Sequence, residues 1–110
     1  MNEMDGVFAA LADPTRRRVV ELLADGPRRA GDLAAGTGMQ ATAMTRHLRV
    51  LRTSGLVEVE TAEADARLRV YRLRPDRFVA LQAWLDQVQA FWSEQLLSFK
   101  AHAEGRGDQP

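Results

Sequence analysis

Apolar residues recur along the first half of the chain at the three- and four-residue spacing of an amphipathic helix. We expect each segment with this spacing to be a helix that contributes to one core: Met4 to Ala12, Pro14 to Ala24, Arg29 to Ala35, and Gln40 to Thr53. The pattern is strongest in the fourth segment, where Met44, Leu48 and Leu51 stand at i, i+4 and i+7. These three side chains predict the buried face of the fourth helix, and therefore also its exposed face.

Residues with special backbone preferences separate these helices. Asp13 is placed to cap the second helix, and Pro14 stands at the first helical position, where its missing N–H costs nothing. Gly36 and Gly38 lie between the third and fourth helices, and they favour a sharp turn because glycine adopts backbone angles that other residues avoid. Two helices joined by such a short turn are typical of a helix-turn-helix.

The spacing of apolar residues changes from helical to alternating at Leu56. The stretches "LVEVE" and "LRVYRL" predict a β-hairpin from Leu56 to Leu73. We expect a loose tip around Ala62 to Arg67, since no Asn-Gly or Asp-Gly pair marks a tight turn. Helical spacing returns from Arg77 to Ala103. Four helices, a hairpin and a final helix make a mainly α protein with a small β-hairpin, which is an α+β fold.

The length of 110 residues suits one domain, which we expect to span residues 1–104 and to be followed by a disordered tail over residues 105–110. No cysteine is present, which excludes disulfides and thiolate metal sites. The chain shows neither a signal peptide nor an apolar run long enough to span a membrane, so we expect a cytoplasmic protein. No set of nucleophile, base and orienting residue appears, which argues against an enzyme.

The formal net charge of zero hides a basic middle, because residues 14–77 hold 13 arginines and 8 acidic residues. Arg46, His47, Arg49 and Arg52 lie in the fourth helix, and no acidic residue occurs between residues 39 and 57. A helix that only covers a core usually mixes both signs, since opposite charges three or four positions apart support each other. The pattern favours a polyanionic partner such as nucleic acid, with a merely solubilising role as the alternative.

Three stretches resemble the sequence of a known family: "LADPTRRRVVELL", "AMTRHLRVLRTSGLV" and "YRL". With them, the chain from about Val7 to Leu97 resembles the ArsR/SmtB family of dimeric winged helix-turn-helix transcriptional regulators. The resemblance implies a homodimer that binds double-stranded DNA at an inverted-repeat operator, most often as a repressor, with no membrane partner. A protein-interaction module that keeps the winged fold without binding DNA is the alternative.

The exposed side of the fourth helix is suited to DNA, because an α-helix fits the major groove and its first residues reach the bases. The candidate residues on and before this helix are Gln40, Thr42, Thr45, Arg46, His47 and Arg49. We expect Gln40, Thr42 and Arg46 to contact bases and the other three to hold phosphates. For His47, a packed imidazole is the alternative.

By resemblance, the hairpin would act as a wing from which Arg67 and Arg69 reach the DNA backbone or the minor groove. The chain has "ADAR" where the family usually has a Gly-Arg turn, so wing contact stays an open question. The far end of the hairpin carries three more arginines, and we expect these to pair with nearby acids: Arg72, Arg74 and Arg77, with Asp76, Glu58 or Glu60.

The run "TRRR" at residues 15–18 stands at the start of the second helix. Positive charge there opposes the helix dipole and costs from a few tenths up to about 1 kcal/mol for each residue. We expect compensation by Glu3, Asp5 or Asp13. Contact with DNA phosphate is the alternative for Arg16 or Arg17.

The final helix carries more apolar surface than a small monomer can hide, and monomers avoid exposed apolar patches of several hundred Å². By resemblance, the first and last helices of two protomers pack about a two-fold axis. We therefore expect a dimer interface that includes Phe8, Trp84, Phe91, Trp92, Leu96 and Phe99.

The metal sites of the family match this chain poorly. The thiolate pattern of the third helix falls on "RAGDL", so Arg29 and Gly31 stand in place of the cysteines. The pattern of the final helix keeps two of its four positions, Asp86 and His102, which are weak candidates for a metal-responsive regulator. Imidazole and carboxylate ligands would favour nickel or zinc. Without a metal, an unidentified effector or a partner protein would supply the signal.

Overall fold

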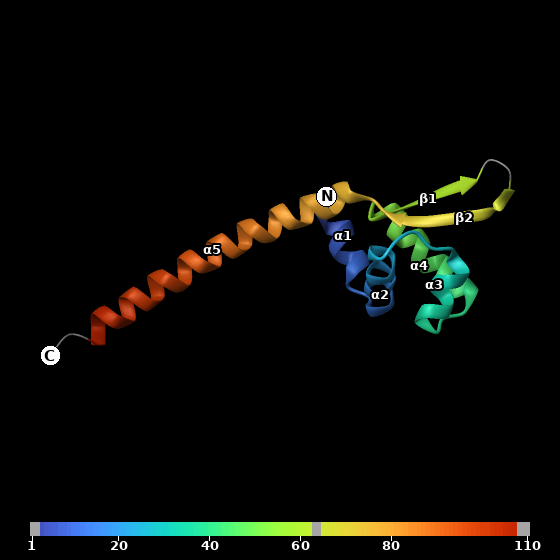
Figure 1. Ribbon diagram of the computed structural model, residues 1–110. Coiled ribbons are helices and arrows are strands. Elements are labelled where there is room, and N and C mark those ends of the chain that lie inside the picture. The colour runs from blue at the N-terminus through green and yellow to red at the C-terminus, as the bar shows by residue number, and fades with distance from the viewer. Residues whose placement is uncertain (1–2, 63–64, 108–110) are drawn as a thin grey trace. The chain divides into compact units, whose positions relative to one another are not determined.

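The computed structural model describes residues 3–62 and 65–107, with the side chains of residues 62–68 and 106–107 outside that description. The elements follow in chain order (Figure 1): α1 (Glu3–Leu11), α2 (Pro14–Ala24), α3 (Ala30–Thr37), α4 (Ala41–Thr53), β1 (Val57–Ala62), β2 (Asp65–Leu73) and α5 (Pro75–Gly107). This order confirms the predicted mainly α fold with one hairpin. The chain forms two compact units, Met1–Phe78 and Val79–Pro110.

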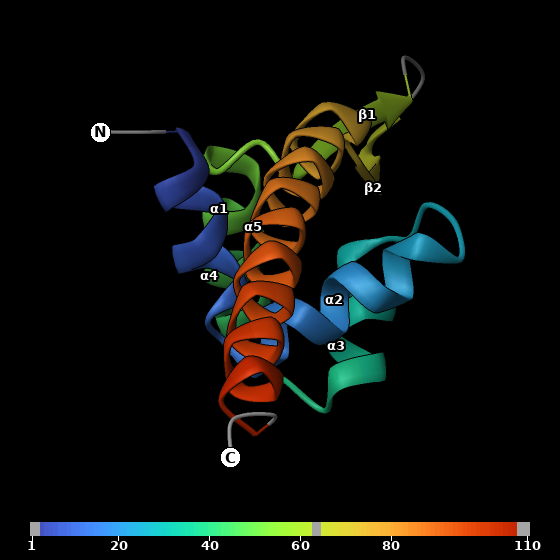
Figure 2. The same ribbon diagram turned by 90° about the vertical axis from the view of Figure 1, so that its left-hand side faces the viewer.

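The core of the first unit lies where α1 to α4 meet the base of the hairpin, and Figure 2 shows α2 and α3 side by side there. Met44, Leu48 and Leu51 of α4 are buried, as their spacing predicts. Burying one such side chain stabilises a fold by roughly 1.5–3 kcal/mol. Because this face of α4 is held inward, its opposite face is exposed.

The junction of α1 and α2 is held by the arginine run. Asp13 caps α2, since its Oδ1 accepts a hydrogen bond from the backbone N–H of Arg16 at 3.1 Å. The side chain of Arg16 donates to the carbonyl of Ala10 at 2.6 Å, and that of Arg17 donates to the carbonyl of Leu11 at 2.8 Å. The last carbonyls of a helix lack partners within it and carry partial negative charge, so the two guanidinium groups satisfy them.

These contacts correct one expectation about the arginine run. Arg16 and Arg17 form no ion pair with the acids of α1 or with Asp13 among the residues that the structure describes. Arg18, the third arginine, pairs with Glu21 of its own helix at 3.3 Å. The acids were expected to pair with the run, whereas the side chains of its first two arginines bind the carbonyl end of α1, and Asp13 attracts Arg16 without forming an ion pair with it.

The turn between α3 and α4 depends on one of its two glycines. Gly38 has a φ of 68°, a left-handed conformation that favours glycine, and it ends α3. Gly36 was expected in the turn but lies inside α3, which continues to Thr37. A Cβ atom at Gly36 would lie 3.0 Å from Cδ1 of Leu22. The missing side chain therefore allows α3 to pack closely on α2.

The two strands pair in antiparallel fashion from Val57 opposite Leu73 to Thr61 opposite Arg69. The register then shifts, and Ala62 pairs with Asp65. The loose tip expected over residues 62–67 is therefore shorter, because β2 begins at residue 65. Residues 63–64, the remainder of that expected tip, lie outside the described residues.

A third segment pairs with the outer edge of β2. The backbone N–H of Arg28 donates to the carbonyl of Tyr71 at 3.0 Å, and the N–H of Tyr71 donates back to the carbonyl of Arg28 at 2.8 Å. These two hydrogen bonds join the hairpin to the link between α2 and α3.

The final helix is longer than its apolar spacing predicts. It begins at Pro75, two residues before Arg77, because proline is well suited to a first helical position. It ends at Gly107, where an ion pair of 3.9 Å between Lys100 and Glu104 supports the last turns. The expected disordered tail included residues 105–107, which are helical, while residues 108–110 lie outside the described part.

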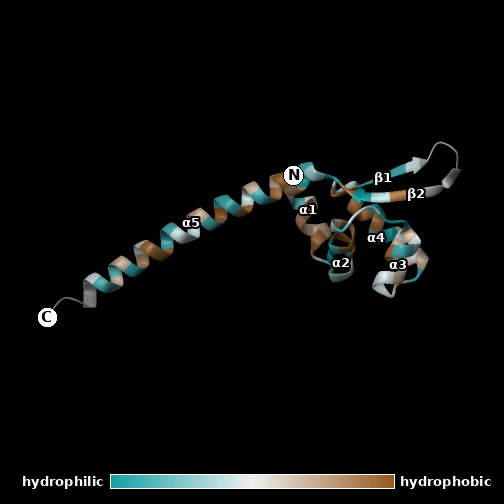
Figure 3. Ribbon diagram, in the orientation of Figure 1, coloured by the Kyte–Doolittle hydropathy of each residue, from teal (hydrophilic) through white to brown (hydrophobic). Residues whose placement is uncertain are grey.

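Apolar and polar residues alternate along α5, as the hydropathy colours show (Figure 3). Several large apolar side chains of this helix are exposed in the single chain, including Phe91, Trp92, Leu96 and Phe99. The rings of Phe91 and Trp92 meet edge to face, with centroids 5.8 Å apart. No helix in the described ranges is long and apolar enough to cross a membrane.

Candidate nucleic-acid interface

The exposed side of α4 lies opposite its buried methionine and leucines. Thr42, Arg46 and Arg49 are exposed and stand at i, i+4 and i+7, so they share one face. Gln40 immediately precedes the helix as its N-cap residue, and its side-chain amide makes no capping hydrogen bond. The face therefore presents amide, hydroxyl and guanidinium groups from its N-terminal end onward, without an acidic residue.

Apart from Arg67, whose side chain lies outside the described part of the structure, the arginines between residues 14 and 77 fall into two groups. Members of the first group donate hydrogen bonds or form ion pairs: Arg16, Arg17, Arg18, Arg28, Arg72, Arg74 and Arg77. Members of the second group, here called the unpaired arginines, are exposed and make neither contact with any described residue: Arg29, Arg46, Arg49, Arg52 and Arg69. Their donors remain available to a ligand.

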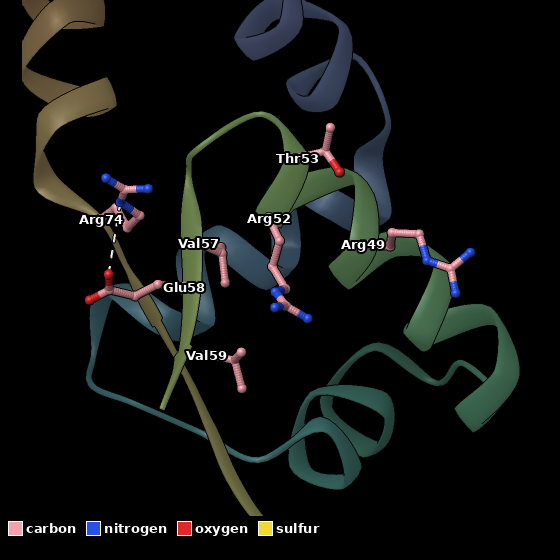
Figure 4. Close-up of a pocket in the computed structure, with 7 residues that line it drawn as sticks. All are labelled: Arg49, Arg52, Thr53, Val57, Glu58, Val59 and Arg74. Atoms are coloured by element: carbon pink, nitrogen blue, oxygen red, sulfur yellow. Dashed lines mark ion pairs between the residues drawn. The ribbon is translucent and has the colours of Figure 1, made fainter. Parts of the chain in front are cut away.

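A hollow of about 430 Å³ separates the C-terminal half of α4 from β1 (Figure 4). Val57 and Val59 point from β1 toward this hollow, and Arg52 extends into the space beside them. Glu58 points the other way, toward Arg74, as alternation along a strand requires. The hollow therefore has an apolar floor and a rim that includes Arg49 and Arg52.

A second hollow, of about 550 Å³, lies where the start of α3, the middle of α4 and β2 come together. Arg29, Thr45 and Arg69 belong to its lining, together with the buried Tyr71. Sequence reasoning did not assign Arg29 or Arg52 to the interface. Arg52 belonged to the basic pattern of the fourth helix but was not among the DNA-binding candidates, and Arg29 was in neither set. The structure places each of them at a hollow, without an ion pair among the described residues.

Two of the predicted phosphate-binding residues already have partners. The hydroxyl of Thr45 donates to the carbonyl of Ala41 at 2.9 Å. Nδ1 of the half-buried His47 lies 3.4 Å from Nη1 of Arg16. Because a guanidinium group only donates, Nδ1 can accept this hydrogen bond only in a ring form that carries no proton on Nδ1. The packed-imidazole alternative thus has structural support, and a phosphate contact by His47 stays a prediction.

The negative charge of Asp13 partly compensates the positive charge near Arg16 and His47. The hydrogen bond from the backbone N–H of Arg16 lowers the pKa of the Asp13 carboxyl, and the charges of Arg16 and His47 lower this pKa further. Partial burial acts in the opposite direction. Asp13 therefore stays ionised to a lower pH than an ordinary aspartate does.

The base of the hairpin is tied by ion pairs. Nε of Arg72 donates to Glu58 at 2.7 Å, and this hydrogen bond raises the pKa of the Arg72 guanidinium. Arg74 lies 3.3 Å from Asp76 and 3.8 Å from Glu58. The expected pairing is thus confirmed for these two arginines.

Arg77 departs from that expectation, because it pairs with Glu3 of α1 at 3.4 Å. Of the two wing candidates, Arg69 is exposed, and the side chain of Arg67 lies outside the described part of the structure. Contact between the wing and DNA therefore stays a prediction.

The two metal candidates lie on α5. Asp86 accepts a hydrogen bond from Gln82 at 2.9 Å. Within the described ranges, no cluster of three or more histidine, aspartate or glutamate side chains is arranged to hold a metal ion. Asp86 and His102 are both exposed, and neither belongs to such a cluster.

Known proteins share both the sequence and the fold of this chain. A family model described as "Bacterial regulatory protein, arsR family" matches residues 13–59. The HTH-type transcriptional regulator Rv2034 of Mycobacterium tuberculosis is 38% identical over 104 residues, which cover 94% of this chain and 92% of the relative. The match extends from the helix-turn-helix through most of the chain.

Two solved structures have the same fold. An ArsR-like transcriptional regulator from Rhodococcus sp. RHA1 is 30% identical with a TM-score of 0.78, over 94% of this chain and 92% of that one. A homodimeric winged helix-turn-helix DNA-binding domain, Mb0332 from Mycobacterium bovis, is 29% identical with a TM-score of 0.64, over 84% of this chain and 83% of that one. The hairpin of β1 and β2 thus corresponds to a wing.

Proposed function

Because the chain belongs to the ArsR family of bacterial regulatory proteins, we propose that it is a homodimeric transcriptional regulator that binds an inverted-repeat operator. The observation that carries this proposal is the exposed surface of α4, which lacks acidic residues and holds Arg46 and Arg49, with the unpaired Arg52 beside them at the hollow toward β1. DNA phosphates compensate such a surface, since its charge has no acidic partner within the described residues. The protein is not an enzyme.

In this proposal, α4 lies in the major groove of the operator. Gln40, Thr42 and Arg46 contact base edges, because they lie at the N-terminal end of the exposed face. A bidentate contact between an arginine and a guanine discriminates between bases by about 1–3 kcal/mol. Arg46 is therefore the main candidate for sequence recognition.

Backbone contacts surround this centre and set the register of the helix on DNA. They come from the other residues of α4 and from the two hollows beside it: Thr45, His47, Arg49, Arg52, Arg29 and Arg69. The two hollows flank α4 on the β1 side and at the start of α3, so these contacts would reach the phosphates on both sides of the groove.

We propose further that α1 and α5 form the dimer interface. The residues involved are Phe8, Trp84, Phe91, Trp92, Leu96 and Phe99. Support comes from the exposed fractions of Trp92 and Phe99, which are 57% and 73% in the single chain. The homodimeric state of the Mycobacterium bovis domain supports the same assembly. Two protomers related by a two-fold axis require an operator with matching symmetry.

Repression follows if the operator overlaps a promoter, because a dimer bound across about two turns of DNA excludes RNA polymerase. Such a regulator acts on bacterial DNA and therefore in the cytoplasm.

A fluorescence anisotropy titration tests the proposal. The full chain is titrated against duplexes from the DNA beside its own gene and against a shuffled duplex of equal length, at several salt concentrations. We expect saturable binding that prefers one duplex, and a log affinity that falls linearly with log salt concentration. Equal affinity for the shuffled duplex at every salt concentration would contradict sequence recognition. Lack of binding to any duplex would favour a protein-interaction module.

A further inference from the structure

Arg77, in the first turn of α5, contacts two segments outside its own helix: α1 and the link between α4 and β1. Its Nη1 lies 3.4 Å from Oε2 of Glu3, the first residue of α1. Its stem crosses Gly55, where a Cβ atom would lie 3.0 Å from Nε and 3.1 Å from Cγ of Arg77. Its side chain is 29% exposed, which makes it the most covered arginine among the described ion pairs.

Gly55 is a demanding place for such a contact. It is buried, with a φ of 81°, and it follows α4 by two residues. Its N–H donates to the carbonyl of Arg52 at 3.0 Å, and the N–H of Leu56 donates to the carbonyl of Leu51 at 3.1 Å. The backbone at Gly55 is therefore continuous with the last turn of the recognition helix, and a side chain that packs on Gly55 bears on that helix directly.

We propose that Arg77 is a positioning residue that sets the orientation of α4 relative to the first turns of α1 and α5. This inference rests on the proposed function, in which α1 and α5 carry the dimer contacts and α4 reads the operator. In such a dimer, the orientation of α4 relative to α1 and the first turn of α5 contributes to how far apart, and at what rotation, the two recognition helices stand. Arg77 thereby determines which spacing between half-sites the dimer prefers.

The expected property is a preference for spacing. B-form DNA has about 10–10.5 base pairs in a turn, so adding or removing one base pair rotates one half-site by about 35° relative to the other. A rigidly oriented pair of helices loses affinity under this change. A pair whose orientation has become loose loses less, because each helix can follow its half-site.

The experiment compares variants of the full-length chain on three duplexes. The operator is selected by the wild-type protein from a random duplex library, and two further duplexes add or remove one central base pair. The variants are Arg77→Ala, which removes both contacts, Arg77→Met, which keeps much of the stem, and Arg77→Lys, which keeps stem and charge. Arg18→Met is the matched control, because it breaks the ion pair with Glu21 within α2.

We expect the ratio of affinities between the native and altered spacings to fall by about threefold to tenfold in Arg77→Ala. Arg77→Met should lie between Arg77→Ala and the wild type, Arg77→Lys should restore most of the ratio, and Arg18→Met should leave it unchanged. The dimer dissociation constant and the affinity for a single half-site should stay within about twofold of the wild type. A purely structural role would lower all affinities together and leave the ratio intact.

An unchanged spacing ratio in both Arg77→Ala and Arg77→Met would overturn this inference, even with wild-type binding intact. If Arg77→Ala fails to fold, Arg77→Met alone decides, since it retains the packing on Gly55. Failure of the proposed function has a different signature: the wild-type protein would select no sequence from the library.

Discussion

Individual arginines of this chain have different structural roles, which the sequence alone does not distinguish. Arg16 and Arg17 donate to the carbonyl end of α1, while Arg46 and Arg49 have no partner among the described residues. A charge count cannot separate these groups, because the carbonyls that bind the first pair belong to a different helix. The helical spacing of α4 did predict which arginines face outward, since the buried residues fix the exposed side.

Arg46→Ala tests base recognition at the residue scale. We expect the affinity for the operator to fall by about 1–3 kcal/mol, and the affinity for a shuffled duplex to fall much less. Anisotropy titrations of both duplexes at one salt concentration measure the difference. Arg18→Ala serves as the control because it removes an arginine that pairs within α2. Equal losses on both duplexes would reassign Arg46 to the DNA backbone.

Asp13→Ala tests the cap of α2. We expect the free energy of unfolding to fall by about 1 kcal/mol at neutral pH, because the N–H of Arg16 loses its acceptor. Urea unfolding at a fixed protein concentration measures the change, since the stability of a dimer depends on concentration. Asp13→Asn should cost less, because the amide oxygen still accepts the hydrogen bond.

The same carboxyl gives stability a pH dependence. The pKa of Asp13 is lowered in the folded protein, so the unfolded chain binds more protons in the acid range. Its contribution is complete above the ordinary aspartate pKa, about 3.9, and is lost as the pH falls through the lower folded pKa. In Asp13→Asn, urea unfolding between neutral pH and the acid range should show a smaller loss of stability. If the free energy of unfolding of Asp13→Asn falls with pH as steeply as that of the wild type, Asp13 does not contribute to the pH dependence of stability.

Among the elements, the helices were easier to predict than their ends. The four short helices lie where apolar residues have helical spacing, and the hairpin lies where that spacing becomes alternating. Gly38 ends α3 as expected, but Gly36 lies inside that helix against Leu22. Both glycines give the same signal in the sequence. Only the approach of α2, a contact between distant residues, separates a glycine that turns the chain from one that makes room for a neighbour.

The hairpin offers a matched pair of arginines for testing the wing. Arg69 has no ion pair among the described residues, whereas Arg72 pairs with Glu58 and Glu60. If the wing contacts DNA, Arg69→Ala should reduce the slope of log affinity against log salt by about 0.9 per protomer. Arg72→Ala should change the slope little, because its charge is already compensated. Equal slopes for Arg69→Ala and the wild type would place the wing away from the phosphates.

At the scale of the whole molecule, the chain divides after Phe78 into two compact units. The apolar residues of α5 predicted a helix that needs a partner, and their exposure in the single chain agrees with that need. The spacing could not predict which helix packs against α5, because a stripe of aromatic residues fits several kinds of helix pair. The family resemblance supplied the two-fold arrangement.

Trp92→Glu tests the dimer interface. We expect the dimer dissociation constant to rise by at least about 30-fold, since a buried tryptophan at an interface contributes roughly 2 kcal/mol or more. Sedimentation equilibrium measures this constant. Ala90→Glu adds the same charge at an exposed position on the opposite side of α5 and should leave the dimer intact. Similar dimer dissociation constants for Trp92→Glu and the wild type would show that Trp92 lies outside the dimer interface.

The bridge between Arg28 and Tyr71 has a consequence for comparisons among relatives. Both of its hydrogen bonds join main-chain atoms, so neither depends on the chemical nature of the residues that occupy positions 28 and 71. Relatives with divergent sequences can keep these two hydrogen bonds while the residue types at positions 28 and 71 change. A sequence alignment would then show only variable positions. Proline alone among the amino acids lacks the amide hydrogen, so a proline at either position would remove one of the two hydrogen bonds between the wing and the α2–α3 link.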